Sequence, residues 1–212
     1  MIGSKKKIGI IGTGGSARET LLCLIDGFGT LPLKIEDIVC FFERDSHLKD
    51  NNVMGVKVLP QSEFDPSVYD VVVGIGDSAL RKKVVQALPV NTTFTNIIHP
   101  DAIISKWVEI GEGSVITAGT VLTCNIKIGN HAQLNLHTNI SHDCEIGDYF
   151  TTAPGVNISG ICKFGDCVYF GTNSSVRQGI NICSNVTIGM GGVVVKDILE
   201  EGVYIGNPVK KL

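Results

Sequence analysis

Large apolar residues recur at every sixth position from Ile98 to Val194. Sixteen of these seventeen positions hold Ile, Leu, Val or Phe, and Thr152 is the exception. An α-helix would scatter a six-residue repeat around its surface, and an isolated strand alternates in twos. In a β-solenoid each six-residue rung is a short strand plus a corner, and one side chain per rung fills the interior. The pattern therefore predicts a β-solenoid over this stretch.

Eighteen residues make one three-sided coil, so the stretch holds roughly five coils at the usual spacing of about 4.8 Å. The register never slips, which excludes a long inserted loop. Flat, apolar outer faces predict packing against copies of the chain, and a closed homotrimer is the usual outcome for such a surface. Residues 196–212 leave the repeat, and GNPVKK predicts a turn that caps the last coil.

The first 97 residues have a different pattern. KIGIIG (7–12) predicts a buried parallel strand, and a helix with apolar positions on one face follows over residues 17–28. The turn between them contains Gly14, Gly15 and Ser16. Glycines at such a turn let a phosphate or ribose approach the backbone, and the helix N-terminus favours an anion. The spacing is G-x-G-G rather than G-x-G-x-x-G, so it does not indicate a dinucleotide.

Two more predicted strands end in polar residues. A strand over residues 38–42 precedes Glu43, Arg44 and Asp45, and one over 71–74 precedes Asp77. Asp77 or Ser78 is the expected N-cap of a helix over 79–88. A last strand near 94–97 leads into the solenoid. Because ligands bind at the carboxyl edge of open α/β sheets, we expect Glu43, Arg44 and Asp77 to join the glycine turn in a substrate site. The alternative is a tight connection without a ligand.

The amino-acid composition argues against several classes of protein. A content of 43% hydrophobic and 18% charged residues is typical of a folded globular protein. The net charge of −3 and the lack of a long basic run argue against nucleic acid as a partner. Seven cysteines without a C-x-x-C pair indicate buried thiols in a reducing compartment. We expect a cytoplasmic protein with neither a signal peptide nor a membrane-spanning segment.

Five sequence segments together resemble one known family. They are GTGGSARE, VGIGDSALRKK, NIIHPDAIIS, NLHTNISHDCEIGD and GNPVKKL. The chain looks like the bacterial left-handed β-helix sugar acyltransferases, which include the nucleotide-amino-sugar N-acetyltransferases of bacillosamine and perosamine type and the sialic acid O-acetyltransferase family. The resemblance implies a Rossmann-like α/β nucleotide-sugar-binding domain (1–97) followed by a left-handed parallel β-helix of hexapeptide repeats (98–212).

By this resemblance His142 is the catalytic base, with Asp143 as its carboxylate neighbour and Asn135 at the matching asparagine. A base near neutrality suits acetyl transfer from a thioester, and a carboxylate would orient the ring and stabilise the imidazolium. His142 lies two residues after an inward position, so a solvent-facing corner histidine is the alternative. Acetyl-CoA is the implied co-substrate, without a metal. Its matched positions are Thr151, Gly160, Thr172, Gly189, Met190, Gly191 and Lys210.

The chain departs from the bacillosamine-type pattern at two positions. Ser16 stands where those enzymes carry a histidine in the glycine turn, and Thr151 stands where another histidine touches the cofactor. The first departure bears on the identity of the sugar, and the second bears on the contact with the co-substrate.

The resulting hypothesis is a trimeric, acetyl-CoA-dependent N-acetyltransferase acting on a nucleotide-linked amino sugar for surface glycan biosynthesis. The sugar is expected to be a 4-amino-4,6-dideoxy compound. An O-acetyltransferase of sialic acid or another sugar hydroxyl is the alternative within the family. His137 and His142 also have the H-x4-H spacing of solenoid carbonic anhydrases, but Asp101 occupies the place of a third histidine ligand. A non-catalytic sugar-nucleotide binder is the remaining alternative.

Overall fold

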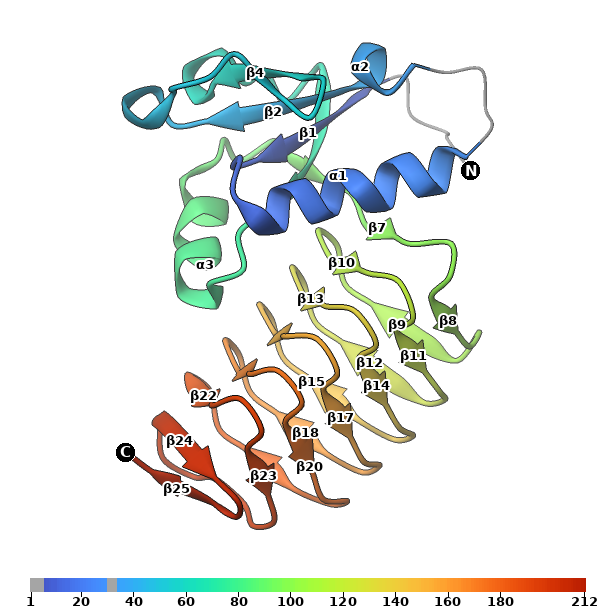
Figure 1. The fold of residues 1–212 in the computed structure, drawn as a ribbon, viewed down its shortest axis with the longest axis vertical. Coiled ribbons are helices and arrows are strands. Elements are labelled where there is room, and N and C mark those ends of the chain that lie inside the picture. Colours follow the sequence, from blue (N-terminus) through green and yellow to red (C-terminus); the bar gives the residue numbers. More distant parts are fainter. Residues whose placement is uncertain (1–5, 30–33) are drawn as a thin grey trace.

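The computed structural model describes residues 6–29 and 34–212. Residues 1–5, which begin the segment expected to lack a signal peptide, and residues 30–33 lie outside this description. A small α/β lobe sits at one end of a long three-sided parallel β-helix, and a C-terminal hairpin lies at the other end (Figure 1). In the described part of the chain, no helix has both the length and the apolarity needed to cross a bilayer.

The lobe contains a six-stranded sheet of order β3-β4-β2-β1-β5-β6, parallel except for the β3–β4 pair. Its strands are β1 (Lys7–Ile11), β2 (Val39–Glu43), β3 (Asn52–Val53), β4 (Val56–Pro60), β5 (Tyr69–Val73) and β6 (Thr93–Phe94). The helices are α1 (Gly15–Phe28), α2 (Ile35–Ile38) and α3 (Ser78–Ala87). The predicted strands and long helices are thus present, whereas α2 and the β3–β4 hairpin were not predicted: β3 is only two residues long, and the alternation of Val56 and Val58 in β4 was missed.

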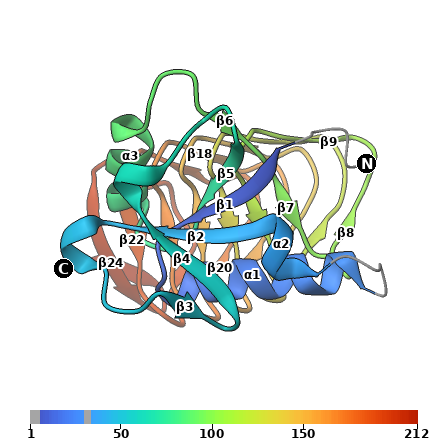
Figure 2. The same cartoon turned by 90° about the horizontal axis from the view of Figure 1, so that it is seen from above.

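The two long helices cover opposite faces of the sheet. Apolar residues of α1 pack with one face of β1, β2 and β5, together with Ile97 and Val115 of the β-helix. The α3 residue Val84 packs on the other face. Viewed from above, α1 and α3 lie on opposite sides of the strands (Figure 2). The doubly wound arrangement brings the carboxyl ends of β1, β2 and β5 side by side.

The β-helix has three faces. We call the first, on which the lobe sits, the lobe face; its strands are β7 (Ile97–Ile98), β10 (Val115–Ile116), β13 (Gln133–Leu134), β16 (Thr151–Thr152), β19 (Tyr169–Phe170), β22 (Val186–Ile188), β24 (Gly202–Gly206) and β25 (Val209–Lys211). The neutral face holds β8 (Ile103–Ile104), β11 (Val121–Leu122), β14 (Asn139–Ile140), β17 (Asn157–Ile158), β20 (Ser175–Val176) and β23 (Val193–Val194). The charged face holds β9 (Val108–Ile110), β12 (Ile126–Ile128), β15 (Glu145–Ile146), β18 (Lys163–Phe164) and β21 (Asn181–Ile182).

Every corner from Gly113 to Gly191 contains a residue with positive φ, and these residues recur every six positions. Five are glycines, and nine carry side chains, among them Asn125, His137 and Asp143. The left-handed conformation costs an L-residue about 1 kcal/mol, and Asn and Asp tolerate it better than most. Successive rungs pair in parallel with a shift of eighteen residues, as between Asn139 and Asn157. Residues eighteen apart are therefore direct neighbours.

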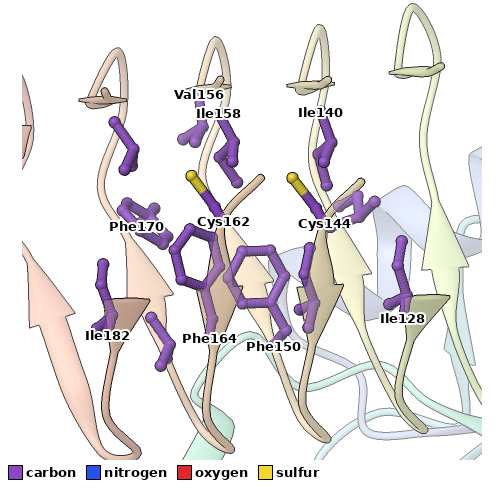
Figure 3. Close-up of a cluster of buried hydrophobic side chains, with 14 of the residues drawn as sticks. Ile128, Ile140, Cys144, Phe150, Val156, Ile158, Cys162, Phe164, Phe170 and Ile182 are labelled. Carbon is purple, nitrogen blue, oxygen red and sulfur yellow. The ribbon is translucent and has the colours of Figure 1, made fainter. Parts of the chain in front are cut away.

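Inward side chains fill the β-helix (Figure 3). They form two sets that each recur every six residues and are spread over all three faces, and we call each set a column. The predicted six-residue column is buried from Ile116 onward. A second column lies two residues before it and was not predicted, because it mixes small and large residues such as Ser114, Cys144 and Phe150. Phe150 adds volume in the rung where Thr152 is small, and its ring lies 5.8 Å from those of Phe164 and Phe170.

Ile98, the first member of the predicted inward column, is an exception. It is 43% exposed, because it lies in the first coil and no earlier coil covers it. The predicted C-terminal cap is an antiparallel pair, β24 with β25, in which β24 extends the lobe face.

A buried arginine connects the lobe to the β-helix. Arg81 on α3 has no exposed surface, and its guanidinium donates to Ile75 O (2.6 Å) and Gly76 O (3.1 Å) in the lobe. It also donates to three carbonyls and one hydroxyl of the β-helix, namely His131 O (2.9 Å), Tyr149 O (2.9 Å), Phe150 O (3.3 Å) and Thr151 Oγ1 (2.7 Å). These bonds satisfy a desolvated charge without a carboxylate partner.

The side chain of His131 is buried at the same junction. Its ring stacks on Tyr149 at 5.2 Å and meets the edge of Phe94 at 4.6 Å. Within the described residues Nδ1 of His131 has no hydrogen-bond partner. Burial, followed by the nearby charge of Arg81, lowers the pKa of His131 from 6.5 to about 4.

We expect the free energy of unfolding to fall as the pH drops below about 6.5, because unfolding releases His131 to take up a proton. The folded pKa lies below the unfolded one, so this stability is complete above pH 6.5 and is lost as the pH falls toward 4. The loss between about pH 7.5 and about pH 5 is about 2 kcal/mol. Urea unfolding of the wild type and His131→Asn at both pH values measures it. The control is His137→Asn, at an exposed corner with the same backbone conformation, and it should lose as much unfolding free energy between the two pH values as the wild type. An equal loss in all three proteins would contradict the assignment to His131.

Candidate functional site

The glycine turn and the ends of β1, β2 and β5 enclose a cavity of about 290 Å³, which we call the turn cavity. Gly14 and Gly15 begin α1, and an added Cβ at either would meet nothing within 4 Å, so these glycines leave open space. Gly74 lies where β5 approaches α1, and a Cβ there would lie 2.6 Å from Ala17 Cα. The predicted residues Gly14, Gly15, Ser16, Glu43 and Arg44 all line the turn cavity.

Two predicted acidic residues accept hydrogen bonds from within the protein. Glu43 Oε2 accepts a 2.6 Å hydrogen bond from the Thr13 hydroxyl, and Oε1 accepts one of 2.9 Å from Arg44 N. Glu43 therefore ties the glycine turn to the end of β2. Asp77 is the N-cap of α3, since its Oδ1 accepts a 2.6 Å bond from Leu80 N. From the sequence we predicted the cap role of Asp77 and a place in the substrate site for both carboxylates. The structure shows the cap, and it shows that Glu43 also has a local role within the protein.

A second cavity of about 730 Å³ opens between the N-terminus of α3 and the β-helix, and we call it the groove cavity. Ser16 and Gly76 line both cavities, so the two adjoin at these residues. Asp77, Asn135 and Thr172 line the groove cavity as well. A ligand lying in both cavities would extend from the glycine turn to the surface of the β-helix.

Asn135 follows β13 at the edge between the lobe face and the neutral face, which we call the Asn135 edge. Its side-chain amide donates to Thr152 O at 3.0 Å, and its backbone N–H donates to Thr152 Oγ1 at 3.1 Å. Thr138 also bonds Thr152 Oγ1, at 2.7 Å. The one polar residue in the inward column therefore fixes the position of Asn135.

His142 and Asp143 lie at the edge between the neutral and charged faces, which we call the His142 edge. His142 Nδ1 is 2.7 Å from Asp143 Oδ2, and both side chains are about half exposed. Asn125 donates to the other carboxylate oxygen at 3.1 Å. These bonds, first that from His142, hold the pKa of Asp143 below its usual value. An ionised carboxylate only accepts, so Nδ1 carries the proton and Nε2 of the neutral ring is a free base.

Gly160 lies in the next coil beneath the imidazole of His142. An added Cβ there would lie 2.7 Å from both Cε1 and Nε2 of His142. The φ of Gly160 is not positive, so the glycine is required by this close approach rather than by the backbone.

The residues predicted to contact acetyl-CoA lie in four places. Thr172, Gly189, Met190 and Gly191 follow one another along the Asn135 edge toward the C-terminus, and Met190 is exposed. Gly160 is on the His142 edge, and Lys210 is in β25. Thr151 lies at the lobe junction and lines the groove cavity; it is buried, and its hydroxyl bonds with Arg81, Ser78 and Gly76.

The predicted catalytic residues do not meet within the single chain. The neutral face separates Asn135 from His142, and neither His142 nor Asp143 lines the turn cavity or the groove cavity. A residue that sequence analysis missed is His47, which lines the turn cavity beside Arg44. It lies in a short 3-10 segment, Asp45–His47, where no periodic pattern marks it.

The histidines of the β-helix are dispersed. His131 is buried under the lobe, His99 bonds Asp26 at 3.0 Å, and the ring of His137 lies over Gly119. No group of three or more His, Cys, Asp or Glu in the described part of the chain has the geometry to hold a metal ion. All seven cysteines are free thiols, five of them buried.

Comparisons with known proteins point to one family for both lobe and β-helix. The PglD N-terminal domain family matches residues 7–88. PerB from Caulobacter crescentus, solved with CoA and GDP-perosamine, is 28% identical, with 99% of this chain and 98% of that chain covered and a TM-score of 0.86. The acetyltransferase domain of PglB from Neisseria gonorrhoeae is 26% identical (98% and 100% covered, TM-score 0.87), and a related structure of that domain contains acetyl coenzyme A. WeeI from Acinetobacter baumannii is 30% identical (98% and 100% covered, TM-score 0.88).

We expect Gly160→Ala to fold normally and to lower kcat/KM for acyl transfer by at least about tenfold, because the new methyl group displaces the His142 ring. Thiol release from acetyl-CoA measures the rate, and thermal unfolding checks the fold. Gly27→Ala in α1 is the matched control, since a Cβ there meets nothing within 4 Å. Full activity of Gly160→Ala would show that the ring does not act from this position.

Proposed function

The chain belongs to the left-handed β-helix sugar acyltransferases that use acetyl-CoA, and from this premise we propose that it acetylates the amine of a nucleotide-linked amino sugar. The observation that carries the proposal is the exposed His142–Asp143 pair at 2.7 Å. It supplies a base whose proton-bearing nitrogen is fixed by a carboxylate and whose other nitrogen is available to an acceptor.

The proposed transfer is direct. The acceptor nitrogen attacks the thioester carbonyl carbon while His142 Nε2 removes a proton from that nitrogen. The carbon–sulfur bond of the tetrahedral intermediate then breaks, the amide forms, and the proton passes from His142 to the departing thiolate. Asp143 stabilises the imidazolium that exists between these two proton transfers. Cys144 lies next to this pair in sequence, but it is buried, and its interaction with the Cys162 thiol, followed by burial, raises its pKa, so we assign it no nucleophilic role.

The nucleotide of the acceptor is assigned to the turn cavity. There Gly14, Gly15 and Ser16 expose the N-terminus of α1, which favours the negative charge of phosphate. Arg44 and His47 line the same cavity and add positive or donor groups. The sugar would then extend past Ser16 into the groove cavity toward Asn135. In this assignment residues 1–97 form the nucleotide-sugar-binding domain and residues 98–212 the acyltransferase domain.

An amine acceptor is favoured over a hydroxyl because a nucleotide-binding lobe implies a nucleotide-activated sugar, which free sialic acid would not need. GDP-perosamine is the nucleotide amino sugar in the PerB complex, and we extend that class of acceptor to this chain as a 4-amino-4,6-dideoxy sugar. Its product would serve surface glycan synthesis. The seven free thiols agree with a reducing cytoplasm.

The proposed active unit is a homotrimer. Outward residues of the neutral-face strands carry no charge and are Ile103, Val121, Asn139, Asn157, Ser175 and Val193. Their counterparts on the charged face are Glu109, Lys127, Glu145, Lys163 and Asn181. The neutral face is therefore the cheaper face to desolvate. Three-fold packing through it would place the His142 edge of one protomer near the Asn135 edge of the next.

This arrangement would also bring most of the predicted acetyl-CoA residues close together. Gly160 beside His142 would face Thr172, Gly189, Met190 and Gly191 of a neighbouring protomer. Small residues on both edges leave room for a pantetheine arm, and Lys210 in the terminal hairpin would meet a phosphate. Thr151 would act indirectly, by holding Arg81 and Ser78 where they support the groove cavity.

We expect thiol release from acetyl-CoA with one member of a panel of UDP-, GDP-, dTDP- and CMP-linked amino sugars. His142→Asn should lower kcat at least about a hundredfold while the protein remains folded and binds acetyl-CoA, because only the base is lost. Undiminished turnover by this variant would refute the mechanism. Thiol release only with sialic acid or another hydroxyl would replace the amine with an oxygen acceptor.

Mixing two inactive variants tests whether the site is shared. His142→Ala removes the base, and Ser16→Trp fills the junction of the two cavities. If each site combines the His142 edge of one protomer with the cavities of another, randomly mixed trimers should recover about a quarter of wild-type activity. Co-expression with two affinity tags provides the mixed trimers. No recovery would place the complete site within one protomer.

A further inference from the structure

Asn125 is the residue through which the preceding coil reaches the His142–Asp143 pair. Its side-chain Nδ2 donates to Asp143 Oδ1 at 3.1 Å, and Asp143 Oδ2 meets His142 Nδ1 at 2.7 Å. The three side chains form one chain of hydrogen bonds, with Asn125 at the end opposite the free Nε2. Eighteen residues separate Asn125 from Asp143, so the two are neighbours on successive coils.

The backbone of the corner makes this contact specific. Asn125 and Asp143 both have positive φ, at 54° and 59°, and Asp143 N donates to Cys124 O at 3.1 Å. The residues at the equivalent corner of the next two coils are Ile161 and Gly179, whose side chains cannot donate a hydrogen bond. Asp143 thus receives a side-chain donor from the coil before it and none from the coil after it.

We propose that Asn125 is a positioning residue, which holds the Asp143 carboxylate so that neutral His142 keeps its proton on Nδ1 and presents Nε2 to the acceptor. This inference rests on the proposed role of His142 as the base. An unheld carboxylate rotates about its Cα–Cβ and Cβ–Cγ bonds, and a rotated Asp143 would leave the imidazole free to place its proton on either nitrogen.

The choice of a neutral donor has a chemical reason. A lysine at this position would pair with Asp143 and reduce the negative charge that stabilises the imidazolium. An aspartate would repel Asp143 and donate no hydrogen bond. Asparagine supplies an N–H without changing the charge of the pair, and it also tolerates the left-handed corner. In keeping with this, hydrogen bonds from His142 and then Asn125 hold the pKa of Asp143 below its usual value.

Two substitutions separate the hydrogen bond from the backbone. Asn125→Gly removes the amide and suits the positive φ, and Asn125→Asp keeps the shape while replacing the donor with a second carboxylate. The matched control is Asn173→Gly, which removes an asparagine from a corner of the same conformation (φ 56°) on the Asn135 edge. Thermal unfolding should show that all three variants fold.

The first readout is the tautomer of His142, measured by ¹⁵N NMR of ring-labelled protein on the basic side of the titration of this imidazole. The His142→Asn variant identifies its signals. Wild type and Asn173→Gly should show the Nδ1–H form, whereas Asn125→Gly and Asn125→Asp should show more of the Nε2–H form. The second readout is kcat, which should fall about fivefold in Asn125→Gly with both KM values unchanged.

An unchanged tautomer in both Asn125 variants would overturn the inference, whatever happens to kcat. A changed tautomer with unchanged kcat would also overturn it, since the orientation would then not matter for transfer. The NMR measurement needs no acceptor. If wild type transfers no acetyl group to any acceptor, the proposed function fails, while the tautomer shift still reports the hold of Asn125 on Asp143.

Discussion

The repeating corner is the constraint on which the rest of the structure depends. A left-handed residue at every sixth position turns the chain without adding or losing a residue, so positions eighteen apart stay in register from Gly113 to Gly191. That register places His142 over Gly160 and Asn125 next to Asp143. One inserted residue between two such partners would turn one of them toward a different face. The functional contacts therefore depend on an unbroken period more than on any local motif.

Arg81 applies a second constraint, on the orientation of the lobe. Its guanidinium donates hydrogen bonds to carbonyls of the Ile75–Gly76 segment and of three β-helix residues at once. A shift of the lobe would therefore leave several of these carbonyls, and the guanidinium N–H groups, without a hydrogen-bond partner. Gly76 is also where the two cavities adjoin. The same bonds that join the domains thus set the distance between the glycine turn and the β-helix surface, which a nucleotide sugar would have to span.

How far the sequence predicts this molecule depends on the range of each interaction. The inward column from Ile98, the strand–turn–helix opening and the Asp77 cap were predictable because each follows from residues close together in the chain. The second column, with Cys144 and Phe150, has no uniform residue type, so no pattern in the sequence indicated it. Thr152 looked like a lapse in the repeat, but its hydroxyl and carbonyl hold Asn135. A break in a packing pattern is expected where a residue holds a candidate site residue, as Thr152 holds Asn135, because the needs of the site then compete with those of packing.

A whole face of the β-helix separates Asn135 from His142, so a site that uses both residues would have to combine two chains. Both residues have defined partners in the single chain, so neither waits for a neighbour to be positioned. Each edge is therefore preorganised, and association would have to align only two rigid edges rather than order flexible side chains, which lowers the entropic cost of assembling a site. The uncharged outward residues of the neutral face would lower the free-energy cost of desolvating that face on association. In the proposed homotrimer the neutral face would serve the reaction as well as the assembly, because packing through it would bring His142 toward the acceptor.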